Sequence, residues 1–226
     1  MWFILDGARY LEYLDLSNCC NLETLPDNIQ NNSMLVTLNL DECRKLKSLP
    51  KLPASLQQSL QQLTAMNCTY LDTNSIQRPM LENMLHRLRI NYGHRSNNLG
   101  DLSFLPGSQV PCEFDFHTTE ASIVIPPMSK SGLCCFVFCI ILSEGININY
   151  GDIFCTIYEH NKHVDECDVF YARGRLISDH VLLSCWYDIY KLVEVGSARG
   201  GDHYNLHLNS NSDIMLMIRY NGQLRG

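Results

Sequence analysis

Two neighbouring segments near the N-terminus carry the same pattern of leucine, cysteine and proline. Residues 11–26 and 35–50 superpose at seven positions when one segment is displaced by 24 residues. A third, partial copy follows 25 residues later, with Leu60, Leu63, Ala65, Cys68 and Leu71 in register. Because a unit this short cannot bury its own leucine face, neighbouring copies have to stack on one another. The coincident positions of the first two copies are Leu11/Leu35, Leu14/Leu38, Leu16/Leu40, Cys19/Cys43, Leu22/Leu46, Leu25/Leu49 and Pro26/Pro50.

This spacing, at a period in the twenties, is typical of leucine-rich repeats, in which each copy forms a short strand and a return segment. Side chains along a strand point alternately to opposite faces. The leucines are therefore expected to point inward, and the residues between them to form an exposed concave face. The residues predicted on that face are Tyr13, Asp15, Ser17, Thr37, Asn39, Asp41, Gln62, Thr64 and Met66.

The pattern predicts three regions, namely about three repeats over residues 1–73, a capping helix and linker over 74–104, and a β-sandwich over 105–226. In the middle region, Ile76, Met80, Met84 and Leu88 have helical spacing. Four arginines and one glutamate between residues 74 and 95 make this stretch basic. A basic amphipathic helix is compatible with nucleic acid or a membrane. We favour a cap over the open end of the repeats.

After residue 105 the hydrophobic period changes to two, and no helical stretch intervenes. Short strands separated by Gly, Asn, Asp and Ser clusters favour an antiparallel β-sandwich, giving a mixed, β-dominated fold class overall. Leu133–Leu142 is apolar on both faces and is predicted to be a central strand. The seven candidate strands are Ser122–Ile125, Leu133–Leu142, Asp152–Glu159, Val164–Tyr171, His180–Tyr187, His203–Leu208 and Asp213–Tyr220.

Composition limits the cellular compartments in which the protein is expected and the kinds of molecule that it is expected to bind. The formal net charge of −7 offers no general electrostatic footprint for nucleic acid. Eleven cysteines, an odd number without framework spacing, indicate a reducing compartment. The longest apolar run, Leu133–Leu142, is too short to span a bilayer as a helix. We therefore expect a cytoplasmic or nuclear protein that binds neither nucleic acid nor membrane.

The sequence contains little that resembles an active site or a metal site. There is no Cys-x-x-Cys pair, and His203 and His207 lack a further ligand at metal spacing, so no metal site is predicted. Asp179, His180 and Cys185 suggest a thiol protease, but on a regular strand His180 and Cys185 face opposite ways. The glycine-rich stretch 196–201 is interpreted as a hairpin loop rather than a phosphate-binding loop. No cofactor is expected.

Several sequence blocks, and the order in which they follow one another, resemble the C-terminal part of plant intracellular immune receptors of the TIR–nucleotide-binding–leucine-rich-repeat class. Leu46–Leu56, with the sequence LKSLPKLPASL, resembles the last repeats of these receptors. Leu105–Pro111, Ala121–Pro127, Phe136–Leu142 and Ile177–Leu182 resemble their post-repeat jelly-roll/Ig-like domain. Two features depart from the family pattern: Glu113–Phe116 stands where an aromatic pair is usual, and the tail after Val195 matches poorly.

The resemblance implies a protein-binding, ligand-sensing region that contributes to recognition of a pathogen effector or a guarded host protein. The contacts would come from the concave face and from loops of the sandwich. No phosphate-binding loop occurs, and the TIR domain with its NAD-cleaving activity is absent, so the chain is not expected to be an enzyme. The upstream receptor domains would then be partners. The alternative is a truncated structural fragment or a non-signalling decoy.

Overall fold

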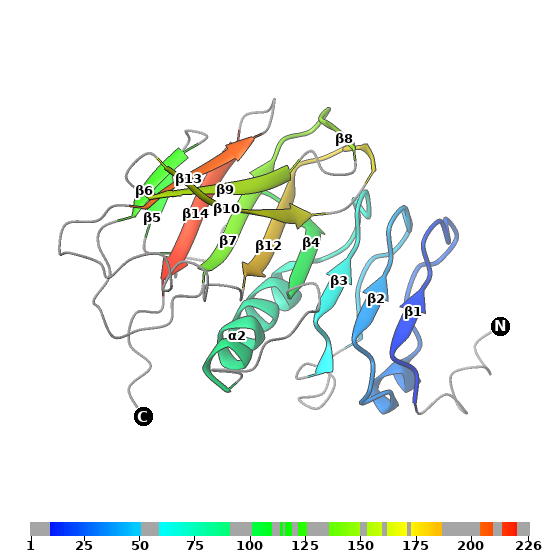
Figure 1. The fold of residues 1–226 in the computed structure, drawn as a ribbon. Helices are drawn as coiled ribbons and strands as arrows, with labels where there is room; N and C mark the ends of the chain where they lie inside the picture. Colours follow the sequence, from blue (N-terminus) through cyan, green and yellow to red (C-terminus); the bar gives the residue numbers. More distant parts are fainter. Residues whose placement is uncertain are drawn as a thin grey trace.

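The chain has a β-dominated mixed fold, with one α-helix in the part of the chain that the computed structural model describes (Figure 1). The predicted linker before residue 101 and the glycine-rich loop 196–201 lie outside the described residues. The structure describes residues 10–50, 59–90, 101–109, 114, 116–118, 122–125, 136–149, 153–159, 162–170, 173–186, 204–209 and 214–220.

Three short parallel strands, one from each sequence copy, form one end of the larger sheet. They are β1 (Tyr13–Asp15), β2 (Thr37–Asn39) and β3 (Gln62–Thr64). Their register places equivalent positions side by side, so that Leu38 lies between Leu14 and Leu63. A 3-10 helix, η2 (Asp27–Asn31), lies in the return segment between β1 and β2.

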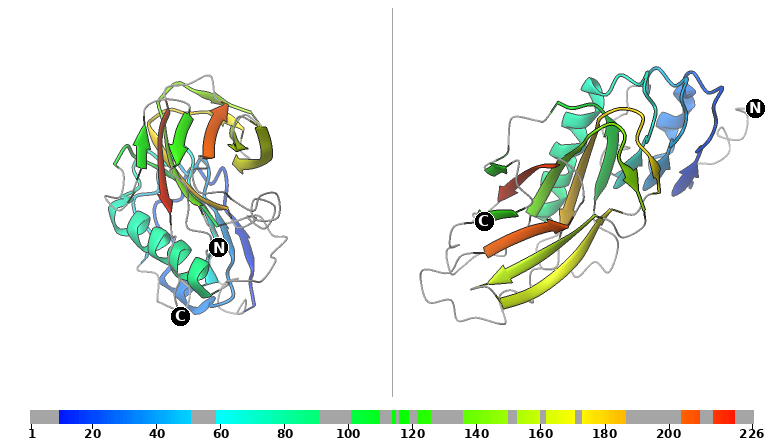
Figure 2. Two further views of the ribbon diagram at one scale, coloured as in Figure 1. Left: turned by 60° about the vertical axis from the view of Figure 1, so that its left-hand side comes forward. Right: turned by 90° about the horizontal axis from the view of Figure 1, so that it is seen from above.

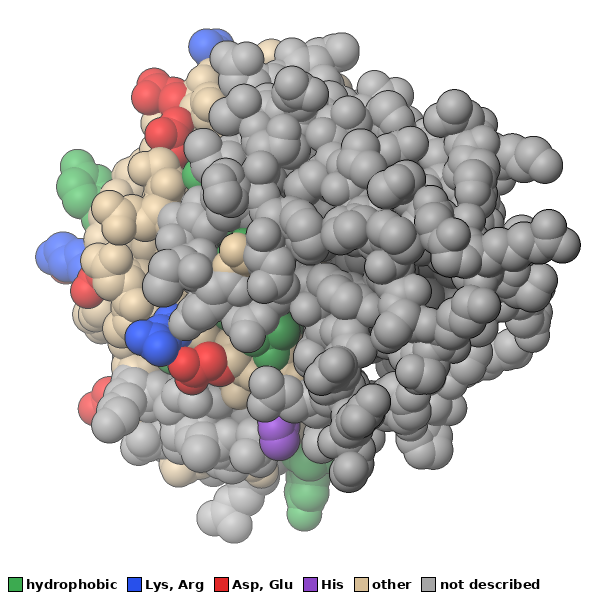
Figure 3. Space-filling view, turned by 90° about the vertical axis from the view of Figure 1, so that its left-hand side faces the viewer, with side chains coloured by type: hydrophobic (Ala, Val, Ile, Leu, Met, Phe, Trp, Pro, Cys, Tyr) green, Lys and Arg blue, Asp and Glu red, His purple; other side chains and the backbone are tan. Residues whose placement is uncertain are grey.

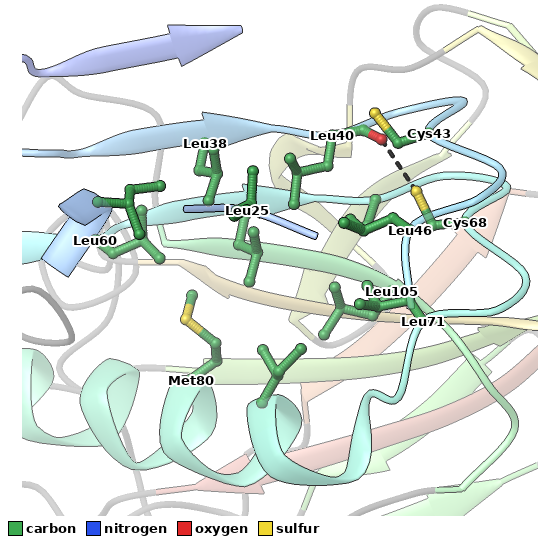
Figure 4. Packing of buried hydrophobic residues seen from close by; sticks show 14 of the residues in the cluster. Leu25, Leu38, Leu40, Cys43, Leu46, Leu60, Cys68, Leu71, Met80 and Leu105 are labelled. Atoms are coloured by element: carbon green, nitrogen blue, oxygen red, sulfur yellow. Dashed lines mark hydrogen bonds between the residues drawn. The ribbon is translucent and has the colours of Figure 1, made fainter. Parts of the chain in front are cut away.

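The leucines of the copies meet in one buried cluster behind these strands (Figure 4). Leu38 is 1% exposed and Leu63 is fully buried, whereas Leu14 is only partly buried. The cysteines at the turns take part through their thiols. Cys68 Sγ donates a hydrogen bond to the Leu40 carbonyl at 3.0 Å, and Cys43 Sγ donates to the Leu16 carbonyl at 3.1 Å. The repeated cysteine therefore ties each copy to the preceding one.

Strand β4 (Leu102–Pro106) joins the repeat strands to the rest of the larger sheet. It runs parallel to β3 and antiparallel to β12 (His180–Trp186). The resulting eight-stranded sheet has the order β1-β2-β3-β4-β12-β7-β14-β5. Its last three strands are β7 (Phe136–Leu142), β14 (Ile214–Tyr220) and β5 (Phe116–Thr118).

A four-stranded antiparallel sheet lies across one face of the larger sheet (Figures 1 and 2). Its order is β10-β9-β13-β6, and a two-stranded ribbon pairs β8 with β11. The bounds of these strands are β6 Ser122–Ile125, β8 Asn147–Ile148, β9 Ile153–Glu159, β10 Lys162–Phe170, β11 Gly174–Arg175 and β13 Tyr204–Asn209.

Helix α2 (Asn74–Ile90) covers the opposite face of the larger sheet (Figure 2). Its first half, with Ile76 and Met80, belongs to the leucine cluster of the repeats. Its second half, with Met84 and Leu85, packs against β7 and β12, where Cys139 is buried. One helix therefore closes both parts of the core. It is not long and apolar enough to cross a membrane, and it is the one α-helix described.

The predicted helical stripe and the predicted strands agree with this structure. Each of the seven candidate strand segments overlaps an observed strand, and β7 is central because it pairs with β12 and β14. The continuity of the sheet was not predicted. Strand β4 begins at Leu102, inside the region 74–104 assigned to helix and linker, and pairs with a repeat strand on one side. The division into three domains remains a prediction.

Candidate functional site

The residues between the inward leucines form three rows that cross the repeat strands, and we call these rows the ladder. The first two rows follow directly from the strand register, which aligns equivalent residues of the copies. Tyr13 is 56% exposed and Asp15 is also exposed, whereas most of the other members are half-buried. The rows are Tyr13, Thr37 and Gln62; Asp15, Asn39 and Thr64; and Ser17, Asp41 and Met66.

Hydrogen bonds between neighbouring copies hold the polar members of the ladder in place. Thr37 Oγ1 donates to Gln62 Oε1 at 3.4 Å, and Thr64 Oγ1 donates to Asn39 Oδ1 at 3.1 Å. Asp41 Oδ1 accepts from the backbone N–H of the third-row neighbour, Met66, at 2.7 Å. The ladder therefore presents fixed polar groups, with Tyr13 offering the largest exposed apolar area.

The prediction of exposure is wrong for Met66, which is 5% exposed. The β11 strand covers it: a methyl group built on Gly174 would lie 2.9 Å from Met66 Cε. The first two rows become apolar at β4. There Leu102 pairs with Gln62 of the first row, and the fully buried Phe104 pairs with Thr64 of the second row. The ladder is thus most exposed at β1 and becomes apolar and covered toward β4.

Asp41 is the most strongly perturbed acid of the ladder. Burial raises the pKa of its carboxyl above the ordinary value, although the hydrogen bonds from the Met66 N–H and the Thr64 hydroxyl act in the opposite direction. Burial disfavours the ionised carboxylate, so the folded protein holds the proton more tightly than the unfolded chain does. The stabilisation that the protonated form provides is complete below the unfolded pKa of about 3.9 and is lost as pH rises through the folded pKa.

Asp41→Asn is therefore expected to stabilise the chain increasingly as pH rises above about 4, because it keeps an acceptor and removes a buried charge. Urea unfolding at several pH values, compared with the unchanged chain, measures this difference. Asp15→Asn makes the same change of net charge at an exposed position in the ladder. An equal pH-dependent gain in Asp15→Asn would show that net charge, rather than burial of Asp41, is responsible.

His180, one of the three residues of the thiol-protease candidate, meets the turn of the third copy at the end of the ladder. Asn67, in the turn of the third copy, donates its backbone N–H to His180 Nε2 at 2.9 Å, although the two residues are far apart in sequence. Cys185 lies on the other face of β12, in the cluster beneath α2. The structure therefore separates His180 from Cys185, as strand alternation predicted. Asn67 was missed as a site residue, although it occupies the same turn position as Asn18 and Glu42.

The described side chains show no group suited to holding a metal ion, since none gathers three or more His, Cys, Asp or Glu residues in reach of one another. Cys139 is buried beneath α2, where burial raises the pKa of its thiol to about 12. In the view from the end of the sheet opposite β1, the few described acidic and basic side chains lie near one another and form no large patch of one sign (Figure 3).

The sequence of this chain is similar to parts of larger Arabidopsis proteins. No protein-family model matches the chain. A disease resistance protein of Arabidopsis thaliana is 30% identical over 203 residues, covering 79% of this chain and 17% of the relative. Disease resistance protein RML1B of the same plant is 31% identical over 141 residues, covering 56% and 13%.

A shorter match, 48% identical over 46 residues, is to the Arabidopsis protein SUPPRESSOR OF npr1-1, CONSTITUTIVE 1, and covers 20% of this chain and 3% of the relative. A solved structure of dimeric latent PorU from Porphyromonas gingivalis gives a TM-score of 0.17 at 12% identity over 57% of this chain and 14% of that one, which is too low to inform the fold. The chain spans less than a fifth of the length of its curated relatives. The two longer matches identify homologues of this chain as plant disease resistance proteins.

Proposed function

We propose that this chain is the C-terminal, ligand-sensing region of a plant intracellular immune receptor and contributes to recognition of a pathogen effector protein. In this proposal the three stacked copies are the last leucine-rich repeats of a longer array in the cytoplasm or nucleus. The strands from β4 onward are the post-repeat jelly-roll/Ig-like domain. The disease resistance homologues and the parallel strands at a repeat of 24 or 25 residues support it.

The observation that carries the proposal is the contrast between the two sides of the repeat strands. On one side, leucines such as Leu38 and Leu63 are almost completely buried. On the other, Tyr13 and Asp15 are exposed while the residues beside them are fixed by hydrogen bonds between copies. A rigid scaffold that displays exposed side chains suits recognition of a protein, and an exposed tyrosine supplies much contact area at little entropic cost.

Tyr13→Ala is expected to weaken binding of the recognised effector by at least about tenfold, as truncation of an aromatic hot spot does. The chain would first be screened against a panel of effector proteins, and the dissociation constant of each positive measured by biolayer interferometry. Tyr70→Ala is the matched control, because Tyr70 is 73% exposed but lies in the return segment outside the ladder. Equal weakening by both variants, or by neither, would contradict recognition by the ladder.

On this proposal the chain binds its partner and catalyses no reaction. The receptor class that it resembles cleaves NAD through a TIR domain, which the sequence does not contain. Incubation of the purified chain with NAD is therefore expected to leave the NAD concentration unchanged. Turnover of NAD that increases with the amount of chain would overturn the assignment as a pure binding module.

A further inference from the structure

The turn of the third copy is bonded to the segment 174–180, which runs from β11 to the start of β12. Asn67 occupies the left-handed region with a φ of 61° and is 1% exposed. Its side-chain Nδ2 donates to the Arg175 carbonyl at 2.9 Å, and its Oδ1 accepts from the Ile177 N–H at 3.0 Å. Both polar atoms of the Asn67 side-chain amide are therefore hydrogen-bonded to this segment.

His180 completes the contact in one protonation state only. A backbone N–H can only donate, so His180 Nε2, which accepts from Asn67, must carry no proton. The ring proton is then on Nδ1, which donates to the Ser178 carbonyl at 2.7 Å. The ring is fully buried and packs on Phe104, with the ring centroids 4.9 Å apart. The neutral imidazole satisfies both of its nitrogens, whereas an imidazolium cannot.

The same segment also holds the loops of the larger sheet. The Asp179 carbonyl accepts from the Gly107 N–H at 2.8 Å, next to β4. The Asp179 carboxylate accepts from the Glu144 N–H at 2.9 Å, just after β7. Asn67 also contacts the second copy, because its Nδ2 donates to Glu42 Oε1 at 2.6 Å. Glu42 follows Asp41 of the ladder in sequence. The Asn67–His180 contact therefore lies between the ladder and the loops that join the antiparallel strands.

We propose that Asn67 and His180 form a pH-sensitive latch, which holds the repeat turn on segment 174–180 while His180 is neutral and opens when His180 gains a proton. A proton on Nε2 would face the Asn67 N–H, so two donors would meet and the hydrogen bond would be lost. The latch needs no effector, and it is independent of the proposed function.

Burial of the ring, which two nearby carboxylates oppose, sets the direction of the response. Among the described residues, those that act on His180 are Asp179 in its own segment and Glu42 in the second copy, and both carboxylates favour the proton. Burial acts against the proton and prevails, so the pKa of His180 is lowered from its ordinary value. The stabilisation that the neutral ring gives is therefore present above the unfolded pKa of about 6.5 and is lost as pH falls through the folded pKa.

Hydrogen exchange of individual amides in the 226-residue chain tests the latch directly. After correction for intrinsic exchange, the Asn67 and Ile177 amides are expected to lose protection by at least about tenfold between roughly pH 7.5 and pH 5. Two amides serve as references, namely Leu40, which donates to the Thr64 carbonyl, and Cys185, which donates to the Asp101 carbonyl. Their protection is expected to change by less than about threefold, because the latch opens locally.

Two variants separate the latch from other titrating groups. His180→Gln offers an amide acceptor and donor that do not titrate, so the loss of protection at low pH is expected to disappear. Asp41→Asn removes the acid of the ladder whose pKa is raised and is expected to leave the loss unchanged. Persistence of the loss in His180→Gln, or its absence from the unchanged chain, would refute the proposal. A parallel loss at all four amides would equally refute it, because it would show global unfolding.

A second measurement decides the matter if His180→Gln does not fold. The ¹⁵N chemical shifts of the His180 ring in the unchanged chain report its protonation at each pH. The proposal requires the Asn67 amide to have lost its protection at any pH at which the ring is protonated on Nε2. Protonation of His180 with full retention of Asn67 protection would overturn it.

Discussion

Arg87→Ala is expected to lower the free energy of unfolding by about 3–5 kcal/mol, as loss of one partner from a buried ion pair does. Arg87 Nε lies 2.8 Å from Asp101 Oδ2, and the two side chains are 8% and 3% exposed. The substitution leaves the Asp101 carboxylate buried without its cation. Urea unfolding followed by circular dichroism at pH about 7 measures the loss.

The same helix contains a matched control for this ion pair. Arg78 Nε lies 3.1 Å from Glu82 Oε1, but these side chains are 70% and 60% exposed. Arg78→Ala is expected to change the free energy of unfolding by no more than about 0.5 kcal/mol, because water screens an exposed pair. The double variant Arg87→Met with Asp101→Asn should recover part of the loss, since no charge then remains buried. A loss as small for Arg87→Ala as for Arg78→Ala would contradict a structural role.

The buried ion pair shows what the positive charge of the helix sequence could not reveal. Arg87 contributes to the local positive charge that admitted a nucleic acid or membrane contact as an alternative. In the structure it points inward, because Asp101 comes just before β4 and the backbone carbonyl of Asp101 accepts from the Cys185 N–H. The partner lies 14 residues away in sequence, beyond the reach of any helical spacing rule. Charge counting along a helix therefore could not show which arginine was buried.

Local periodicity predicted most of the elements correctly. The leucine rows predicted the buried side of the repeat strands, and a spacing of four residues from Ile76 through Met80 to Met84 predicted the apolar face of α2. Alternation also placed His180 and Cys185 on opposite faces of β12. These predictions succeed because each depends on side-chain direction within one element, which the backbone geometry fixes.

Features that depend on pairing between distant segments could not be predicted in this way. Leu102–Pro106 is short and lacks clear alternation, so nothing local indicates that it joins β3 to β12. Met66 follows the spacing of the exposed ladder, yet the β11 strand covers it. Asn67 is merely a turn residue in sequence, and its role depends on Arg175, Ile177 and His180. The exposure of the ladder was therefore predicted correctly at β1 and wrongly at Met66, where the repeats meet the antiparallel strands, and its contact with a protein ligand stays a prediction.

Leu38→Ala is expected to lower the free energy of unfolding by about 2–5 kcal/mol, because truncation leaves a cavity in a tightly packed core. Leu38 is 1% exposed and lies between Leu14 and Leu63 in the strand register. Leu14→Ala is the matched comparison, because Leu14 has the same place in the first copy but is only partly buried. It should lower the free energy of unfolding by roughly half as much or less, as fewer contacts are lost.

The comparison between Leu14 and Leu38 also tests whether these copies continue a longer array. If a preceding repeat stacks on β1 in the whole receptor, Leu14 would be covered there as Leu38 is here, since stacked repeats share one continuous core. Leu14→Ala should then destabilise a longer protein that includes the preceding repeats by about the 2–5 kcal/mol expected of Leu38→Ala. A small loss for Leu14→Ala in both the 226-residue chain and the longer protein would show that β1 remains the edge of the sheet. In that case the copies would not be the last members of a longer array.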